Sequence, residues 1–312
     1  MSLAFIFPGQ GSQAVGMGAE LDVYRPAREV FEEVDDALGQ HLTRLMREGP
    51  IEELTLTENA QPALMAVSLA VMRVLRDEMG AGADGAGFVA GHSLGEYSAL
   101  AAADALTVPD TARLLKLRGQ AMQRAVPVGG GAMASLIGPK ADVALAEAAA
   151  AAGSKVGVCV VANDNNAGNI VISGEKAAVD AAIAEAKTLG AKAIPLNVSA
   201  PFHCPLMQPA ADAMAEALAG ARIVSPKAPV VANVTARPVT DPEEIRRLLV
   251  EQVTGRVRWR ESVEWMAQNG VERFVEAGAG KVLAGMVKRI APDAGACSLG
   301  GPADLEAFAA SL

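Results

Sequence analysis

The sequence predicts an α/β fold in which a parallel sheet, with helices on both faces, is interrupted by a small second domain. Two observations lead to this prediction. Along most of the chain, short apolar runs bounded by glycine alternate with long segments of helical periodicity, a pattern typical of a parallel sheet. Between residues 127 and 197 the order changes to β-α-β-β-α-β, which is typical of ferredoxin-like domains. We therefore expect one domain from residues 1–126 and 198–312, and an insert at 127–197.

The larger domain contains both kinds of segment in turn. Strands are expected at residues 3–7, 87–90, 230–234 and 273–276, where the chain is apolar and β-prone. Helices are expected at residues 26–38, 62–78, 109–124, 206–218, 242–253 and 281–290. Proline recurs near the first turn of these helices, where its missing N–H costs no hydrogen bond. Such starts support the proposed boundaries.

The insert follows the glycine-rich segment VPVGGG at residues 126–131, which we interpret as a flexible joint. Strands are expected at 132–137, 156–161, 169–173 and 191–196, and helices at 142–152 and 175–189. The alanine-rich run within the first of these helices has helical character and is not a disordered tract.

Composition limits the function classes. The chain has 312 residues, of which 51% are hydrophobic, so it can bury a large core. Its net charge of −9 argues against nucleic acid as the main ligand, because phosphate binding needs a basic surface. The cysteines Cys159, Cys204 and Cys297 are far apart and lack a C-x-x-C motif, which favours free thiols in a reducing compartment and no metal site.

The sequence shows no targeting or membrane signal. Its first residues lack a basic segment before the apolar run, and Arg73 and Arg76 interrupt the most apolar helical segment. No helical segment carries a long heptad seam. We therefore expect a cytoplasmic protein with no membrane partner, acting as a monomer.

The segment GHSLGEYSAL at residues 91–100 carries the first candidate for chemistry. It places G-x-S-x-G between an apolar strand and an alanine-rich helix, which is the context of a nucleophile elbow. In such a turn Gly91 and Gly95 allow close backbone approach, and Ser93 is presented as a nucleophile. The alternative is that these small residues only let the helix pack closely on the sheet.

A serine nucleophile needs a base, and the chain has three histidines. His41 stands in a polar stretch typical of a surface helix, and His92 adjoins Ser93 on a turn where neighbours point apart. His203 remains, in the proline-rich loop SAPFHCPLM, although it could also be a buried helix cap. The acid of a triad is not evident, since Asp164 falls in the insert. A backbone carbonyl or an amide would then orient His203 in a Ser-His dyad.

Several further motifs give the chain a clear resemblance to a family. They are FPGQGSQ (7–13), TENAQPAL (57–64), GHSLGEYSAL, LRGQAMQ (117–123), FHCPLM (202–207), VEQVTGRVRW (250–259) and GAGKVLAGMVKRI. Together they resemble the malonyl-CoA:acyl carrier protein transacylases of fatty-acid synthesis over essentially the whole chain. The resemblance implies an α/β-hydrolase-like core with a ferredoxin-like insert, in agreement with the pattern above.

The resemblance also implies a catalytic scheme. Ser93 would attack the thioester of malonyl-CoA while His203 takes its proton, and the malonyl group would pass to the phosphopantetheine thiol of an acyl carrier protein. The backbone N–H groups of Gln10 and Leu94 would form the oxyanion hole. The backbone carbonyl of Gln252 would orient the base. No cofactor or metal is implied, because the phosphopantetheine is carried by the partner.

Substrate contacts follow from the same resemblance. Arg118 would bind the malonyl carboxylate, for which a planar guanidinium is a bidentate match. Phe202 would exclude an added α-methyl group. Asn163 and Asn165 match a loop that faces the cleft from the insert, but this loop has Ala167 and Asn169 where Pro and Gln are common. Contacts from this loop are therefore a weaker expectation. Gln61 matches another position that faces the cleft.

Other functions remain open at this point. The same chemistry would serve a malonate decarboxylase or a polyketide system, with another carrier. A serine acyl hydrolase would release the acyl group to water, and a non-enzymatic scaffold would only bind acyl-CoA or carrier. Two basic clusters could dock an acidic carrier protein, one with Lys281, Lys288 and Arg289 and one with Arg256, Arg258 and Arg260.

Overall fold

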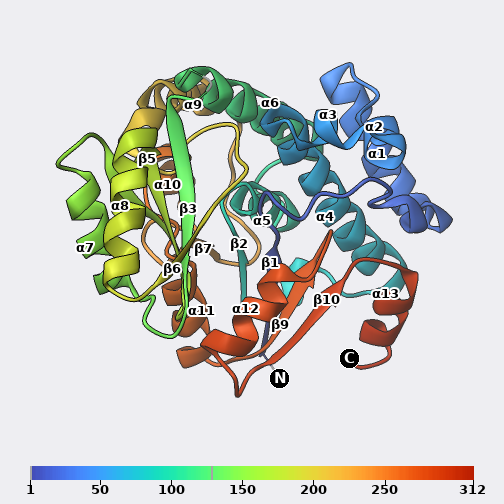
Figure 1. Ribbon diagram of the computed structural model, residues 1–312. Coiled ribbons are helices and arrows are strands. Elements are labelled where there is room, and N and C mark those ends of the chain that lie inside the picture. The colour runs from blue at the N-terminus through green and yellow to red at the C-terminus, as the bar shows by residue number, and fades with distance from the viewer. Residues whose placement is uncertain (1, 128) are drawn as a thin grey trace.

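The computed structural model describes residues 2–127 and 129–312, which form two separate sheets (Figure 1). The larger sheet has the order β10-β9-β1-β2-β7-β8 and is parallel except for the β7–β8 pair. Its strands are β1 (Ser2–Phe7), β2 (Phe88–Gly91), β7 (Val230–Ala232), β8 (Arg237–Val239), β9 (Val271–Ala277) and β10 (Gly295–Leu299). The predicted mixed α/β fold with a mostly parallel sheet is therefore confirmed.

Strand β1 shows why the strands of this sheet appear in the sequence as unbroken apolar runs. Phe5 and Phe7 pack into the core on one face, whereas Ala4 and Ile6 pack into the core on the other. Because successive side chains of a strand point to opposite faces, a strand covered on both faces must be apolar throughout.

Helices cover the two faces unequally. One face packs against α1 (Arg25–Leu38), α4 (Thr57–Met79), α5 (Gly95–Ala102), α6 (Val108–Ala125), α9 (Gln208–Gly220), α10 (Pro242–Thr254) and α13 (Pro302–Ala309). The other packs against α11 (Trp259–Gln268) and α12 (Val282–Ile290). Two short helices, α2 (Leu42–Glu48) and α3 (Ile51–Thr55), link α1 to α4. Among the described residues, no helix combines the length and the hydropathy that a membrane crossing requires.

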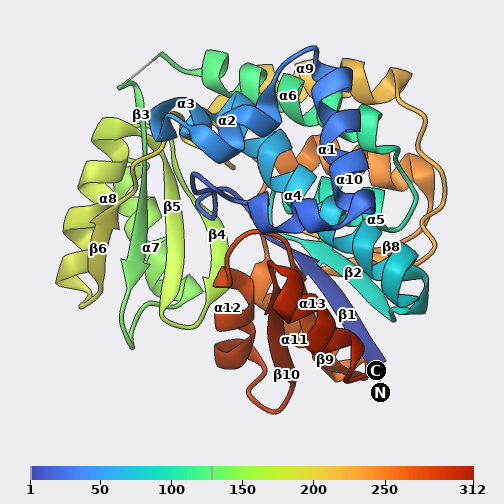
Figure 2. The ribbon, with the colours of Figure 1, turned by 90° about the vertical axis from the view of Figure 1, so that its right-hand side faces the viewer.

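The second sheet forms a lobe beside the first, in green and yellow in Figure 2. Its antiparallel strands have the order β4-β5-β3-β6, with β3 (Gly131–Ile137), β4 (Cys159–Asn166), β5 (Asn169–Glu175) and β6 (Lys192–Pro195). The helices α7 (Val143–Gly153) and α8 (Lys176–Thr188) pack on one of its faces around a small core of its own. This order of elements and strands is that of a ferredoxin-like domain.

The lobe is joined to the larger sheet by more than its two chain connections. Val257 donates to the carbonyl of Ala162 at 2.8 Å, and Asp164 donates to the carbonyl of Val257 at 2.9 Å. The buried carboxylate of Asp164 also pairs with Arg260 at 2.8 Å. Val257 precedes α11 and Arg260 lies in its first turn, so these three contacts fix the lobe against the larger domain at α11 and help to fix the cleft.

The two largest errors in the predicted boundaries concern α4 and β4. Helix α4 begins at Thr57, so Pro62 lies inside the helix and does not mark its start. Strand β4 extends to Asn166, beyond the predicted 156–161, because two irregularities in its pairing with β5 break the alternation that periodicity detects. Asn163 and Asn165 are consequently strand residues and not loop residues. The expected joint at 126–131 includes Val128, which lies outside the described residues.

Candidate active site

Ser93 lies on the sharp turn between β2 and α5. Its backbone φ is +54°, a left-handed value that few non-glycine residues adopt, and this conformation presents the side chain outward. A Cβ at Gly91 would overlap the backbone of Gly95, and one at Gly95 would overlap the carbonyl of Phe7. Both glycines are therefore required by close packing, as the elbow interpretation expected.

His203 faces the nucleophile directly. Its Nε2 lies 2.8 Å from the Ser93 Oγ, and its Nδ1 lies 2.9 Å from the backbone carbonyl of Gln252. Because a carbonyl can only accept, the ring carries its proton on Nδ1, and Nε2 is free to accept from the serine hydroxyl. Burial is the main cause that lowers the pKa of His203 to about 3, with the Arg118 charge second, so the imidazole is neutral near pH 7.

Arg118 enters the same site from α6. Its side chain is 1% exposed, and its Nη2 lies 3.2 Å from the Ser93 Oγ. The guanidinium also donates to the side-chain oxygens of Gln61 at 2.9 Å and Gln252 at 2.8 Å. Its Nε is buried without an acceptor among the described residues. A buried cation held only by neutral groups, beside a nucleophile, is suited to a substrate that carries a negative charge.

Gln252 contacts Ser93, His203 and Arg118 at once, and the sequence did not reveal this role. Its backbone carbonyl orients His203, its Oε1 accepts from Arg118, and its Nε2 donates to the Ser93 carbonyl at 2.9 Å. The expectation from the sequence concerned the backbone carbonyl alone. The side chain is 0% exposed, so both ends of its amide need partners and both have them.

Two further residues of the site were missed from the sequence. The Asn233 side chain accepts from the Ser93 N–H and donates to the Gly91 carbonyl, both at 2.7 Å, which ties the elbow together. The Glu96 carboxyl accepts from the Gln252 amide at 2.9 Å and from the Asn233 N–H at 3.0 Å. Burial raises the pKa of Glu96 to about 7, while these hydrogen bonds and Arg118 act in the opposite direction.

His92 takes no direct part in the Ser-His contact. Its Nε2 lies 2.9 Å from the Asn165 side-chain oxygen, so this contact joins the elbow to β4 of the inserted lobe. Burial lowers the pKa of His92. Both Asn163 and Asn165 line the cleft, as expected, although Asn165 is engaged by His92. His41 is exposed just before α2, away from this site.

A cleft of about 370 Å³ contains the nucleophile and is lined by both lobes. The remaining predicted residues, Gln10, Gln61, Leu94 and Phe202, all lie on its wall. Leu94 directly precedes α5, where a backbone N–H has no acceptor within the helix. Apolar residues that the sequence did not single out complete the wall, including Met122, Met133, Val171, Val198, Leu283 and Met286.

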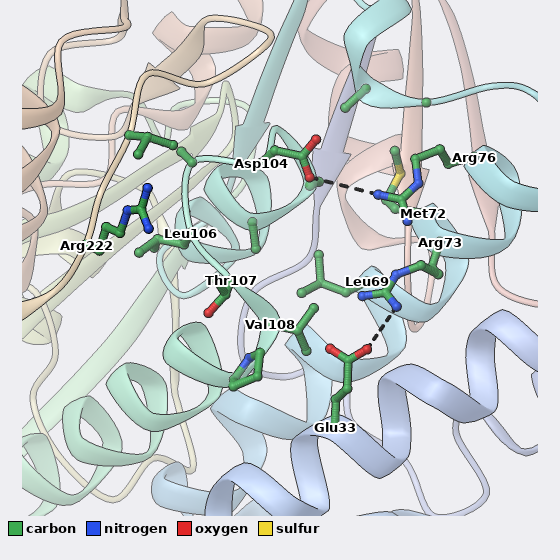
Figure 3. Close-up of a pocket in the computed structure, with 17 residues that line it drawn as sticks. Glu33, Leu69, Met72, Arg73, Arg76, Asp104, Leu106, Thr107, Val108 and Arg222 are labelled. Atoms are coloured by element: carbon green, nitrogen blue, oxygen red, sulfur yellow. Dashed lines mark hydrogen bonds and ion pairs between the residues drawn. The ribbon is translucent and has the colours of Figure 1, made fainter.

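A second cavity, also of about 370 Å³, lies at the opposite ends of α4, α5 and α6 (Figure 3). Figure 3 shows two of its arginines turned toward acidic neighbours: Arg73 pairs with Glu33 at 2.9 Å, and Arg76 approaches Asp104 at 3.9 Å. None of the residues lining it is a serine, cysteine or histidine. The nucleophile and its base therefore lie in the cleft at Ser93 and not in this cavity.

The two basic clusters differ in their surroundings. Arg256 pairs with Glu147, Arg258 with Glu261, and Arg260 with Asp164 and Glu264, so this cluster is largely neutralised. The three basic residues of the other cluster are exposed on or beside α12, whose apolar residues reach the cleft, and they are Lys281, Lys288 and Arg289.

Comparison with known proteins gives one consistent result. The family described as "Acyl transferase domain" matches residues 4–297. The chain is 46% identical over 306 residues to the malonyl CoA-acyl carrier protein transacylase of Escherichia coli strain K12, with 97% of each chain covered. It superposes on the acyl-carrier-protein-S-malonyltransferase of Bartonella henselae with a TM-score of 0.97 and 52% identity, covering 100% and 99% of the two chains.

A third similar structure is a complex. It contains a malonyl-transacylase with a type II PKS acyl-carrier protein, and the chain superposes on it with a TM-score of 0.96. The identity is 41%, and all of both chains is covered. The resemblance inferred from the sequence motifs is thus confirmed at the level of the family.

Proposed function

Because the chain belongs to the acyl transferase domain family, we propose that it works by a two-step transfer through a malonyl-Ser93 intermediate. The overall activity follows from the relatives over nearly the full length of the chain: it is an acyltransferase that moves malonyl from malonyl-CoA to an acyl carrier protein. The observation that carries the mechanism is the meeting of Ser93 Oγ, His203 Nε2 and the buried Arg118 guanidinium at one point.

The first half-reaction needs the serine proton to leave as the new bond forms. As Ser93 Oγ attacks the thioester carbonyl, its proton passes to Nε2 of His203, which is neutral and correctly oriented by Gln252. The tetrahedral intermediate then collapses, the C–S bond breaks, and His203 returns the proton to the leaving thiolate of CoA. The products are malonyl-Ser93 and free CoA.

The developing oxyanion needs donors already in position. We assign this role to the backbone N–H of Leu94, at the start of α5, and to that of Gln10, which follows β1 and also lines the cleft. Donors fixed in the backbone stabilise charge without reorganising during the reaction. The positive end of the α5 dipole acts in the same direction.

Arg118 sets the substrate class in this scheme. A guanidinium 3.2 Å from the attacking oxygen can reach a carboxylate on the α-carbon of the acyl group, and neutral acyl groups leave it unpaired. Phe202, buried on the cleft wall, is placed to limit bulk at that α-carbon. Malonyl satisfies both conditions, and methylmalonyl satisfies only the first.

In the second half-reaction the phosphopantetheine thiol of the carrier attacks malonyl-Ser93. His203 accepts the thiol proton and returns it to Ser93 Oγ as the ester bond breaks, so the free enzyme is restored. No resident metal or cofactor is needed for these proton transfers, which is our proposal for the protein. We further propose that it acts as a monomer in the cytoplasm, consistent with its three free cysteines.

The carrier protein needs a docking face near the cleft. We assign it to the α12 cluster, because Lys281, Lys288 and Arg289 are exposed on or beside a helix whose apolar residues line the cleft, whereas the other basic cluster is paired internally. Reversing charge in Lys288→Glu with Arg289→Glu should raise the KM for an acidic carrier several-fold and flatten its salt dependence. Loading of Ser93 from malonyl-CoA should stay unchanged. Equal loss of both half-reactions would instead place these residues in CoA binding.

Intact mass spectrometry tests the central intermediate. Incubation with malonyl-CoA alone should add one malonyl group, which digestion maps to Ser93, and Ser93→Ala should remain unmodified while melting like the wild type. Addition of the loaded protein to phosphopantetheinylated carrier should move the group to the carrier thiol. An adduct on Cys204 would refute the mechanism, and release of free malonate without transfer would favour a hydrolase.

A further inference from the structure

Glu96 is buried beside the nucleophile, yet the scheme above gives it no role. It stands in the first turn of α5, three residues after Ser93, and is 2% exposed. Carboxylates are seldom buried without a compensating partner, because their desolvation is costly. The contacts of Glu96 lead directly to the groups that perform the reaction.

The first contact fixes the orientation of an amide. An ionised carboxylate can only accept, so the end of the Gln252 amide that faces Glu96 must be its NH₂ group. The oxygen of that amide then faces Arg118 and accepts from its Nη2. The reversed amide would set its oxygen against the carboxylate and its NH₂ against the guanidinium. Glu96 and the Ser93 carbonyl, which accepts from the same NH₂ group, thereby determine which end of Gln252 meets Arg118.

The second contribution is charge. The hydrogen-bond partners of Arg118 are the neutral groups of Gln61, Ser93 and Gln252. Burial lowers the pKa of Arg118, and Glu96, across the Gln252 amide, is the carboxylate whose charge opposes this and favours the protonated guanidinium. The arginine in turn favours the ionised form of Glu96, against the effect of burial.

We propose that Glu96 is a positioning residue and the internal counter-ion of Arg118, and that the carboxylate of the incoming acyl group takes over this second task. The inference rests on the proposed function, because it requires a substrate with a carboxylate. Binding of malonyl brings a second negative charge to one guanidinium. The protonated form of Glu96 is then favoured, so binding of malonyl takes up a proton.

The ionisation of Glu96 determines how the affinity for malonyl changes with pH. In the free site the pKa of Glu96 is about 7, and a bound malonyl carboxylate raises it further. Malonyl binding should therefore weaken as pH rises through 7, whereas binding of a neutral acyl group should not. His203, with a pKa of about 3, stays neutral over this range, and burial lowers the pKa of His92 as well. A guanidinium such as that of Arg118 keeps its charge in proteins.

Calorimetry measures the proton directly. Binding to the Ser93→Ala variant, which cannot be acylated, is compared at pH 7 in two buffers with different heats of ionisation. Binding of malonyl-CoA should take up more protons than binding of acetyl-CoA, by up to about half a proton. The reason is that the Glu96 carboxyl of the free protein is half ionised at pH 7. Subtracting the proton uptake measured with acetyl-CoA removes the contribution of the CoA phosphates, which both ligands share. In Ser93→Ala with Glu96→Gln, the difference between the two ligands should vanish.

A matched control uses another buried carboxyl. Glu276 is 0% exposed, accepts from the backbone of α12 and also has a raised pKa, but it does not contact Arg118 or Gln252. Glu276→Gln in the Ser93→Ala background should keep the full difference in proton uptake. An unchanged difference in Glu96→Gln would overturn the counter-ion role.

Loading kinetics test the positioning role. With Ser93 intact, Glu96→Gln keeps an oxygen for the Gln252 amide, so malonyl loading should stay within a few-fold of wild type at pH 7 and lose its pH dependence between 6 and 8. Glu96→Ala removes that acceptor and should slow loading from malonyl-CoA and acetyl-CoA alike by tenfold or more. Wild-type behaviour of both variants refutes the inference, whereas failure of the wild type to form malonyl-Ser93 refutes the proposed function.

Discussion

Replacing Arg118 by alanine should separate malonyl transfer from neutral acyl transfer. The guanidinium is 1% exposed and lies 3.2 Å from the Ser93 Oγ, so a malonyl carboxylate on Ser93 would be paired in a site that excludes most water. Loss of one partner of a buried hydrogen-bonded charge pair costs about 2–5 kcal/mol. At about 1.4 kcal/mol for each factor of ten, malonyl loading should fall by about 30- to 4,000-fold relative to acetyl loading.

The informative quantity is the ratio of the loading rate with malonyl-CoA to the loading rate with acetyl-CoA. Removing Arg118 also leaves the side-chain oxygens of Gln61 and Gln252 without a donor, and this loss affects every acyl group equally. The CoA portion is common to malonyl-CoA and acetyl-CoA, so its contacts cancel as well. What remains in the ratio is the interaction between the guanidinium and the acyl carboxylate.

Loading is followed by quenched-flow mass spectrometry of acyl-Ser93 with each thioester. Arg118→Lys serves as the control, because it keeps the positive charge but loses the planar guanidinium that can bind a carboxylate through two hydrogen bonds. Its ratio of malonyl to acetyl loading should fall between the ratios of the wild type and Arg118→Ala. Thermal melting excludes unfolding as the cause. If both substrates lose the same factor, Arg118 is a structural residue and the assignment of the carboxylate site is wrong.

Three further predictions follow from the same geometry. His203→Ala should slow Ser93 loading by ~10²–10⁴-fold, and because burial holds the pKa of His203 near 3, the wild-type rate should show no acid limb near pH 6.5 in a pH–rate profile. Phe202→Ala should raise kcat/KM for methylmalonyl-CoA relative to malonyl-CoA in a competition assay, and an unchanged ratio would assign the ring to packing alone. Gly91→Ala should abolish the folded elbow, seen as loss of Ser93 loading with a lowered melting temperature, because the new Cβ would overlap Gly95.

Local chemistry made part of this site predictable from the sequence. The strand-turn-helix context and two glycines located Ser93, and the shortage of histidines isolated His203. These inferences use rules that act within a few residues: a tight turn needs glycine, and a nucleophile needs a base. The alternation of apolar runs with helical periodicity likewise predicted the mostly parallel sheet, because a strand buried on both faces must be apolar throughout.

The polar network behind the nucleophile was not predictable in the same way. Gln252 meets Ser93 across 159 positions of sequence, and Asn233 meets it across 140. Glu96 resembles an acidic residue in the first turn of any helix, where the dipole favours it, so nothing local distinguishes it from an exposed side chain. Burial of these polar groups is decided by tertiary packing.

The inserted lobe shows a second limit of sequence reasoning. Its order of elements was correctly predicted, but β4 was placed too early, because irregular pairing with β5 disturbs the alternation of apolar and polar residues. These irregular positions bring Asn163 and Asn165 to the wall of the cleft. Sequence periodicity therefore failed at the part of the lobe that serves the site.

The electrostatics of the site link substrate choice to base strength. His203 is oriented by a carbonyl and not by a carboxylate, so among the described residues only backbone hydrogen bonds oppose the two main causes that lower its pKa, which are burial and the charge of Arg118. A malonyl carboxylate on Arg118 would offset the second cause, and the imidazole would become a stronger base when that substrate is present. A neutral acyl group adds no such charge, so Arg118 keeps lowering the pKa of His203 and the base stays weak. Arg118 thus disfavours neutral acyl groups twice, through binding and through the proton transfer, and its removal should raise the absolute rate of acetyl loading if the second effect exceeds the loss of orientation at Gln252.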